Sequence, residues 1–143
     1  MSTAPETVVR RFLQALAQRD ATGAAAQLAA GAVLVGPGGT AHGSLEALFA
    51  SSRLRYQFVD KSIEGVEVVE RDSGHAIVYC RGTLFGRWFD GEPFAGIRFI
   101  DRFEINGGLI TGQWVWNDVA LHRPGLPISP DRSPQPARPG TSA

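Results

Sequence analysis

An aspartate on a strand of apolar and aromatic residues is the clearest candidate for chemistry in this sequence. Alternate side chains of a strand face the same way, so in the segment 97–105 Asp101 shares its face with Phe99 and Phe103. An aspartate between two phenylalanines loses hydration, and this raises its pKa unless a cation or several donors compensate. A buried, protonated carboxyl group can donate a hydrogen bond to an oxyanion or a proton to a leaving group. An ion pair with an arginine of a neighbouring strand is the structural alternative.

A second acid, Asp118, ends the last expected strand. It has the same parity as Trp114 and Trp116, so an acid and two tryptophans would share one face. That combination suits the wall of a pocket for a flat, largely apolar ligand. The alternative for the tryptophans is packing in the core or in a dimer interface, and the alternative for Asp118 is a strand end in contact with solvent.

Arg81 is the cation expected nearest to these acids. We expect it to point inward with Tyr79 from the segment 76–85, where it could orient Asp101, Asp118 or a substrate anion. A role limited to charge balance is the alternative.

The remaining polar residues suggest little further chemistry. The three histidines lack metal-ligand spacing and Cys80 is the only cysteine, so we expect no metal site and no internal disulfide. His42, which precedes a helix near the mouth of a possible pocket, is a candidate acid or base. The glycine-rich stretch 36–39 lacks the spacing and the lysine of a phosphate loop. We expect no cofactor.

Charge and hydropathy limit the partners. Lys+Arg and Asp+Glu both number 14, and this balance favours neither a nucleic acid nor an acidic membrane as a partner. The first residues lack the features of a signal peptide, and no apolar run has the length of a membrane span. We therefore expect a cytoplasmic protein, and the expected pocket implies a hydrophobic small molecule as its partner.

Helices come first in the element order. Thr3 is expected to cap a helix whose apolar residues, Phe12 among them, recur at three- and four-residue spacing. Asp20 opens a second, alanine-rich helix that Gly31 ends, the segment 32–35 is a short strand, and Ser44 caps a third helix.

From Tyr56 onward the apolar period changes to two. Four extended segments, 56–70, 75–87, 94–105 and 109–119, are separated by short turns, so neighbouring strands are expected to be antiparallel. Helices followed by a meander indicate an α+β fold. Residues 123–143 contain six prolines and few large apolar side chains, so we expect a domain over residues 1–122 and a disordered tail over 123–143.

Two sets of residues carry a family resemblance. The first is Val8-Val9-Arg10-Arg11-Phe12-Leu13, and the second is the run 99–105 followed by Gly108-Leu109-Ile110 and Trp114-x-Trp116-Asn117-Asp118. Over about residues 5–121 the chain resembles the nuclear transport factor 2-like superfamily, in its SnoaL-like branch. The resemblance implies a cone-shaped α+β fold, with N-terminal helices on a curved, mostly antiparallel sheet, a deep pocket and a homodimer. Members include polyketide cyclases, ketosteroid isomerase, limonene epoxide hydrolase and non-catalytic binders, so the fold does not fix the function.

The match to ketosteroid isomerase is partial. Asp101 matches the acid of its oxyanion hole, whereas Phe12 stands where that enzyme has its tyrosine and about Gly36 stands where it has its general base.

The other enzymes match at different residues. Arg81 and Asp118 match limonene epoxide hydrolase, but Thr83 replaces its central acid and cannot relay a proton as a carboxylate does. Asp118 also matches the acid/base aspartate of the SnoaL-type cyclases.

The leading hypothesis is a cofactor-free isomerase or cyclase-type lyase that acts on a small hydrophobic carbonyl compound. Asp118 would move the proton, Asp101 would stabilise the enolate oxygen and Arg81 would hold their charge states apart. A non-catalytic small-molecule-binding or dimerisation module is the alternative, and an epoxide hydrolase is a minor one. The residues expected to contact the substrate are Trp114, Trp116, Phe99, Phe103, Tyr79 and Phe12.

Overall fold

The computed structural model describes residues 3–127, in which helices lie on one side of a single curved sheet. The elements in chain order are α1 (Pro5–Ala17), α2 (Ala21–Ala25), β1 (Leu28–Val35), the 3-10 turn η1 (Pro37–Gly39), β2 (Ala41–His42), α3 (Leu45–Arg55), β3 (Tyr56–Glu70), β4 (His75–Trp88), β5 (Pro93–Asn106), β6 (Leu109–Asn117) and α4 (Val119–His122).

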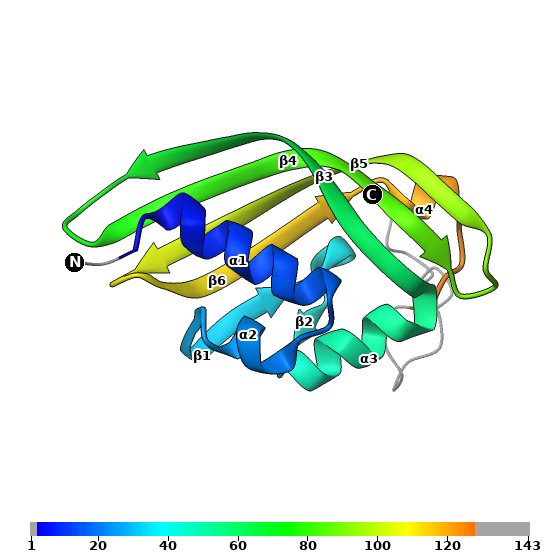
Figure 1. Cartoon of the computed structure of the whole chain (residues 1–143), viewed down its shortest axis with the longest axis horizontal. Coiled ribbons are helices and arrows are strands. Elements are labelled where there is room, and N and C mark those ends of the chain that lie inside the picture. The colour runs from blue at the N-terminus through cyan, green and yellow to red at the C-terminus, as the bar shows by residue number, and fades with distance from the viewer. Residues whose placement is uncertain (1–2, 128–143) are drawn as a thin grey trace, which may run out of the picture.

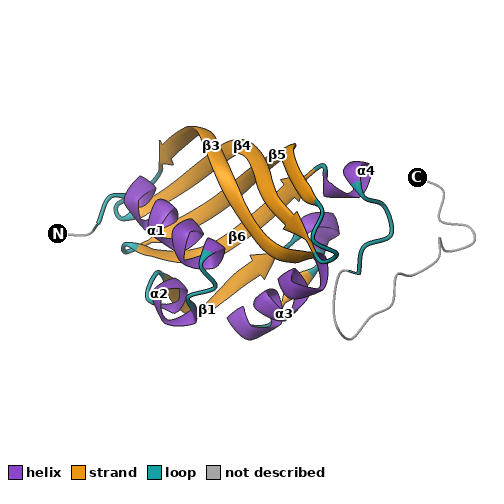
Figure 2. Cartoon of the chain, turned by 45° about the vertical axis from the view of Figure 1, so that its right-hand side comes forward, coloured by secondary structure: helices purple, strands orange, loops and turns teal. Residues whose placement is uncertain are grey.

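The six strands form one sheet in the order β2-β1-β6-β5-β4-β3. All neighbours are antiparallel except β1 and β6, which run parallel. The helices α1, α2 and α3 lie over one face of this sheet, while α4 lies at the end of the molecule away from the N-terminus (Figures 1 and 2). The α+β class, the helices and the meander predicted from sequence are confirmed.

The core lies between α1 and the inner face of the sheet. Helix α1 buries Val8, Val9, Phe12 and Leu13. Phe12 meets Phe103 of β5 edge-on, with ring centroids 6.1 Å apart and planes at 83°. Both rings are fully buried, so this contact joins the first helix to the centre of the sheet.

The strong bend of β3 over β4 depends on glycine. A β-carbon built on Gly82 would lie 1.9 Å from the carbonyl oxygen of Ser62, and one on Gly86 would lie 2.1 Å from that of Phe58. Both glycines lie near register shifts between β3 and β4, where the backbone of β3 presses onto β4. The small residues therefore permit the curvature that opens the sheet around a cavity.

A β-bulge in β6 changes which side chains face inward. Ile105 pairs with Ile110 and Glu104 pairs with Gly112, so Thr111 is the extra residue. The Thr111 hydroxyl donates to the carbonyl oxygen of Glu104 at 3.2 Å, which fixes the bulge. Side-chain parity is reversed beyond it.

The first part of the chain differs from prediction in three details. Ala4, not Thr3, occupies the N-cap of α1, and no side chain caps that helix. Asp20 does cap α2, since its carboxylate accepts the Gly23 N–H at 3.0 Å, but the helix ends at Ala25. Strand β1 begins at Leu28 and continues through Gly31, whose φ of 73° coincides with a register shift against β6.

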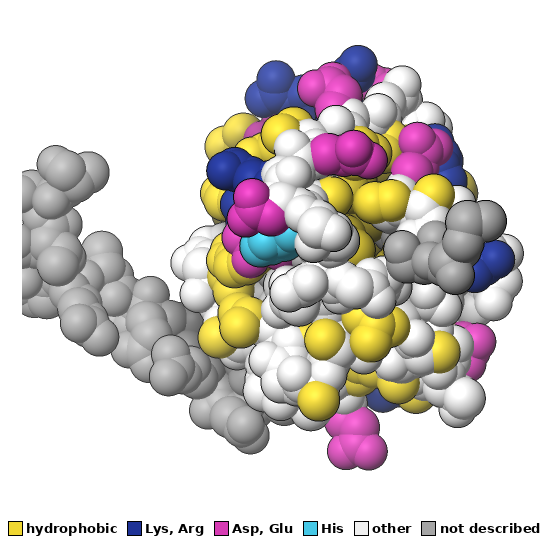
Figure 3. Space-filling view, turned by 90° about the vertical axis from the view of Figure 1, so that its left-hand side faces the viewer, with side chains coloured by type: hydrophobic (Ala, Val, Ile, Leu, Met, Phe, Trp, Pro, Cys, Tyr) yellow, Lys and Arg dark blue, Asp and Glu magenta, His cyan; other side chains and the backbone are white. Residues whose placement is uncertain are grey.

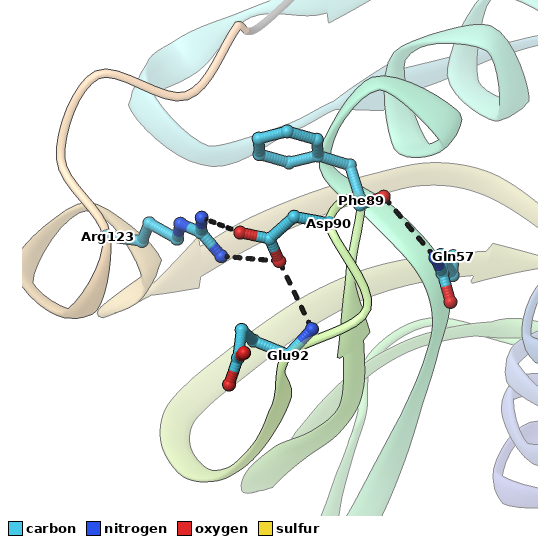
Figure 4. A network of polar contacts seen from close by, with 5 residues as sticks. All are labelled: Gln57, Phe89, Asp90, Glu92 and Arg123. Atoms are coloured by element: carbon cyan, nitrogen blue, oxygen red, sulfur yellow. Dashed lines mark hydrogen bonds and ion pairs between the residues drawn. The ribbon is translucent and has the colours of Figure 1, made fainter.

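Residues 119–127 pack against the β4–β5 turn and α3. The Arg123 guanidinium forms a two-armed ion pair with the Asp90 carboxylate, which also accepts the Glu92 N–H (Figure 4). This hydrogen bonding to Arg123 lowers the pKa of Asp90. At the end of the segment, Arg55 donates to the carbonyl oxygen of Pro127 at 3.3 Å. Residues 123–127, which composition assigned to the tail, thus contact the domain, and the rest of the expected tail, 128–143, lies outside the described residues.

The surface at the N-terminal end carries mixed charge. Figure 3 shows acidic and basic side chains interspersed with hydrophobic ones on this face. In the part of the chain that the structure describes, no helix has the length and apolar character needed to cross a membrane.

Candidate active site

A cavity of about 130 Å³ lies between the helices and the inner face of the sheet. Its apolar wall comes from the end of α1, from η1, from α3 and from the strands β1, β3, β4 and β6. These residues are Leu13, Leu16, Ala17, Val35, Pro37, Leu48, Phe49, Val59, Leu84 and Val115. The polar groups on the wall are fewer: His42, Ser52, Arg55, Tyr56, Asp60, Lys61, Gln113 and Asn117. A mostly apolar cavity with a few polar groups is the usual form of a small-molecule site.

An ion pair joins this wall to the interior of the sheet. The Lys61 Nζ lies 2.5 Å from Asp101 Oδ2 and 4.9 Å from the centre of the Phe99 ring. The Lys61 side chain is 18% exposed, whereas that of Asp101 is fully buried. Lys61 is therefore a cation at the cavity wall that a buried carboxylate and an aromatic face hold in place.

Burial controls the protonation of Asp101. Loss of hydration raises the pKa of the Asp101 carboxyl, and the nearby Lys61 ammonium and Gln113 side chain offset only part of this effect. Among the described residues, no group donates a hydrogen bond to Asp101 Oδ1. The pKa of Asp101 is thus raised although a cation lies beside it, and that cation is Lys61 rather than Arg81.

His42 is a titratable group on the cavity wall with a shifted pKa. Burial lowers the pKa of His42, and the positive charge of Arg55 lowers it further. At neutral pH the imidazole is therefore uncharged and able to accept a proton. Its location at the cavity agrees with the sequence-based expectation.

Cys80 has no comparable role. It is fully buried and lies opposite Asp101 in the sheet register. Burial, together with the nearby Asp101, raises the pKa of the Cys80 thiol to about 11. It is therefore a thiol at neutral pH and packs as a small apolar group.

The predicted inward orientation of Arg81 is wrong. Arg81 pairs with Ile100 in the register, and the two lie on the outer face. Its side chain is 54% exposed and lies 3.9 Å from Glu64 and 4.0 Å from Glu67. The error has a physical reason. Strand β4 carries small apolar side chains on its inner face and larger side chains on its outer face, so the sizes of the side chains did not show which face is buried. Tyr79 lies on the outer face with Arg81.

The predicted place of Trp114 and Trp116 on the cavity wall is also wrong. Because the bulge at Thr111 reverses the parity of β6, Gln113, Val115 and Asn117 face the cavity in their place. Trp114 packs over Gly112 on the outer face, with the Arg102 guanidinium 5.2 Å from its ring centre.

Asp118 lies outside the main cavity. Its carboxylate pairs with the exposed Arg98 at 2.6 Å and lines a second, open hollow together with Trp116 and Phe99. Asn117 lines both spaces. Three of the predicted site residues, Asp118, Trp116 and Phe99, therefore lie together, but at the second hollow and not in the main cavity.

Phe12 and Phe103 belong to the core. Neither is among the residues that line the main cavity, and both are fully buried against each other. Of the predicted site residues, Asp101 and Phe99 lie directly behind the polar wall of the cavity, through their contacts with Lys61.

Lys61 is the functional candidate that sequence reasoning missed. Two signals for it were present in the sequence. It alternates with Val59 and Ile63, which pack against the core, and it is the only lysine in the chain. Gln113 and Asn117 were not predicted to face the cavity, because the bulge in β6 reverses the side-chain parity of that strand.

The described residues contain no cluster of three or more His, Cys, Asp or Glu side chains that could hold a metal ion. The polar wall consists mainly of hydrogen-bond donors, together with one imidazole and the Asp60 carboxylate, a set suited to proton transfer and oxyanion binding.

Comparisons with known proteins agree with this architecture. Residues 9–113 match the SnoaL-like domain family. No curated protein matches the sequence significantly.

Three solved structures illustrate the likeness. An NTF2-like protein of unknown function from Burkholderia pseudomallei is 18% identical, with 82% of this chain and 92% of that chain covered and a TM-score of 0.64. A protein with a ketosteroid isomerase-like fold from Catenulispora acidiphila, in complex with trimethylamine, is 20% identical, with 92% and 100% covered and a TM-score of 0.65. A candidate polyketide cyclase from a Silicibacter species is 13% identical, with 82% and 90% covered and a TM-score of 0.61. The match over residues 9–113 shows that the chain belongs to the SnoaL-like domain family, with the fold of the nuclear transport factor 2-like superfamily.

Proposed function

We propose that this protein is an isomerase or cyclase-type lyase that moves protons on a small hydrophobic carbonyl compound. The observation that carries the proposal is the Lys61 ammonium, fixed by buried Asp101 at the wall of an apolar cavity that His42 also lines. The candidate polyketide cyclase among the structural relatives supports the proposal by likeness of fold.

Lys61 would stabilise negative charge on the substrate oxygen. Within the described residues its ammonium makes one hydrogen bond, to Asp101, and an ammonium has three N–H donors. The remaining donors are available to a carbonyl oxygen that becomes an enolate oxygen. Donors of this kind are strongest in a dry site, where removal of one lowers the rate by about 100- to 1000-fold.

His42 would take the proton from the carbon next to the carbonyl. Its lowered pKa keeps the imidazole neutral at physiological pH, as a general base requires. Because His42 must be neutral to act, the rate should rise with pH through its lowered pKa and level off below the ordinary histidine value of about 6.5.

The cavity size limits the substrate. A cavity of about 150 Å³ holds one benzene molecule, and the cavity here measures about 130 Å³. A compound with a single six-membered ring, or a chain of similar size, is therefore the expected substrate.

Hydrogen–deuterium exchange at the carbons next to the carbonyl of cyclohexanone and of cyclohexane-1,3-dione tests this function. We expect the protein to accelerate exchange in D₂O, followed by proton NMR, and Lys61→Met and His42→Gln each to slow it by at least about 100-fold. Arg71→Met makes the same change of cation to methionine in the exposed β3–β4 turn and should leave the rate unchanged.

Two results would contradict the proposal. One is exchange that does not depend on Lys61 or His42. The other is exchange that Asp118→Asn abolishes while Lys61→Met does not, because that would place the chemistry at the second hollow, as the sequence-based hypothesis for Asp118 requires.

Non-catalytic binding is the second candidate function. The ion pair between Lys61 and Asp101 favours this function, because it balances the charge of the ammonium without a substrate. Saturable binding of these ketones with no acceleration of exchange would support the binder and reject the enzyme.

A further inference from the structure

The single lysine of this chain lies at a position where a lysine could do chemistry that an arginine cannot. The sequence has thirteen arginines and one lysine, Lys61. The described arginines include those that make the ion pairs on the outer surface, with Glu6, Glu64, Asp118 and Asp90 as partners. Lys61 lines the cavity, as Arg55 does, and it forms an ion pair with the buried carboxylate of Asp101.

An arginine would be the better residue for an ion pair alone. Its planar guanidinium can bind both oxygens of a carboxylate, whereas Lys61 contacts Oδ2 and leaves Asp101 Oδ1 without a donor among the described residues. A lysine amine can lose its proton and attack a carbonyl carbon, and a guanidinium cannot. The choice of lysine at this position therefore points to covalent chemistry.

Asp101 is placed to accept the proton that must leave first. Nζ lies 2.5 Å from Oδ2, a direct path for the proton. Burial makes separated charges costly, so transfer from ammonium to carboxylate, which leaves two neutral groups, costs less here than in water. The raised pKa of Asp101 acts in the same direction.

We propose that Lys61 forms an imine with a ring-sized aldehyde in this cavity, with Asp101 as the proton relay. The inference rests on the proposed function in one respect, because it uses the same cavity and a carbonyl ligand, and it adds a covalent bond and names the nucleophile.

The atoms balance without an oxidant or reductant. Lys61 gives one proton to the Asp101 carboxylate, and the Nζ lone pair forms a bond to the carbonyl carbon as the C=O π electrons move to oxygen. The oxygen takes up two protons that come from Nζ through Asp101 and leaves as water. The product is a protonated imine that keeps one N–H, with Asp101 again a carboxylate.

Reductive trapping of benzaldehyde with sodium cyanoborohydride tests the imine. We expect intact-mass spectrometry of the folded full-length chain to show the addition of one benzyl group at neutral pH, and peptide mapping to place it on Lys61. The N-terminal amine is the one other primary amine that this sequence offers, and the peptide map separates the two sites.

Three variants make the test specific. Lys61→Arg keeps the charge and should lose the adduct. Ala17→Phe keeps Lys61 but fills the cavity, since Ala17 lines it, and should lower the trapping rate at Lys61 by at least about tenfold. Asp101→Asn should also slow trapping by at least about tenfold, because solvent must then remove the proton.

The outcomes separate the two proposals. A benzyl group found at the N-terminal amine alone, or equal trapping at Lys61 with the cavity filled, would overturn the imine. Ketone exchange that depends on Lys61 without a Lys61 adduct would reject the imine and keep the proposed function. A Lys61 adduct without ketone exchange would support the imine and reject the acid/base function.

Discussion

Lys61 and Asp101 make the stability of the folded chain depend on pH in a defined direction. Burial raises the folded-state pKa of Asp101 above its value in the unfolded chain, which is about 3.9. Between these two values the folded state holds the proton more tightly than the unfolded state. The contribution of this group to stability is therefore greatest below the unfolded-state pKa and falls as pH rises through the folded-state pKa.

The substitution Asp101→Asn isolates this effect, because asparagine has nearly the same shape and does not titrate. We expect the free energy of unfolding of the wild type, relative to that of the variant, to decline as pH rises above the unfolded-state pKa of about 3.9. Urea denaturation at each pH measures the difference. Asp72→Asn, in an exposed turn, is the control and should show little dependence on pH. A relative stability that rises with pH would mean that the folded-state pKa of Asp101 is lowered, not raised.

At the level of the elements, glycine at two positions of β4 allows β3 to bend over it. We expect Gly82→Ala to reduce the free energy of unfolding by about 1–3 kcal/mol, because its β-carbon would overlap the carbonyl oxygen of Ser62. Gly43 has open space around its β-carbon position, so Gly43→Ala should change stability by less than about 0.5 kcal/mol. Thermal and chemical denaturation compare the two. Equal stability of both variants would show that β3 can move away from β4 at little cost.

The order of the elements could be predicted from the sequence, because the apolar period changes from helical to alternating at Tyr56 and each turn carries glycine or a polar cluster. The capping of α3 was also predictable, since Ser44 accepts the Ala47 N–H at 3.0 Å as expected. These features depend on neighbours in the sequence. They are therefore visible without the tertiary structure.

The inner face of the sheet could not be predicted in the same way. One extra residue at Thr111 reverses the side-chain parity of β6. Strict alternation counted from Ile110 therefore assigns the two tryptophans to the wrong face. On β4 both faces are apolar enough to be core, so the choice between them depends on pairing with β5. Asp101 was assigned correctly to the inner face, because that face of β5 is the apolar one. Its partner Lys61 lies 40 residues away, and to predict their contact one must know the register of three strands.

At the level of the whole molecule, the outer face of the sheet has the composition of a contact surface. Trp116 is 53% exposed and Ile100 39% exposed, and Trp114, Arg98 and Arg102 lie on the same face. Aromatic residues and arginine are enriched in protein interfaces, and lysine is depleted. The homodimer implied by the family resemblance stays a prediction, and this face is where we expect it.

Light scattering coupled to gel filtration measures the dimer. We expect twice the mass of the chain at micromolar concentration and a shift to the monomer in Trp116→Asp. Leu121→Asp, at the most exposed large apolar residue among those described, should remain dimeric. A wild-type protein that is monomeric at every concentration would contradict the prediction.

The central claim is that a carbonyl compound binds in the cavity against Lys61, and the single lysine permits a direct measurement. Protein labelled with ¹⁵N at the lysine side chain gives one ammonium signal in NMR spectra, which belongs to Lys61. We predict that cyclohexanone shifts this signal saturably in the wild type and leaves it in place in Ala17→Phe, where the cavity is filled. A signal that stays unchanged up to saturating ketone, or that shifts equally in both proteins, would contradict the claim.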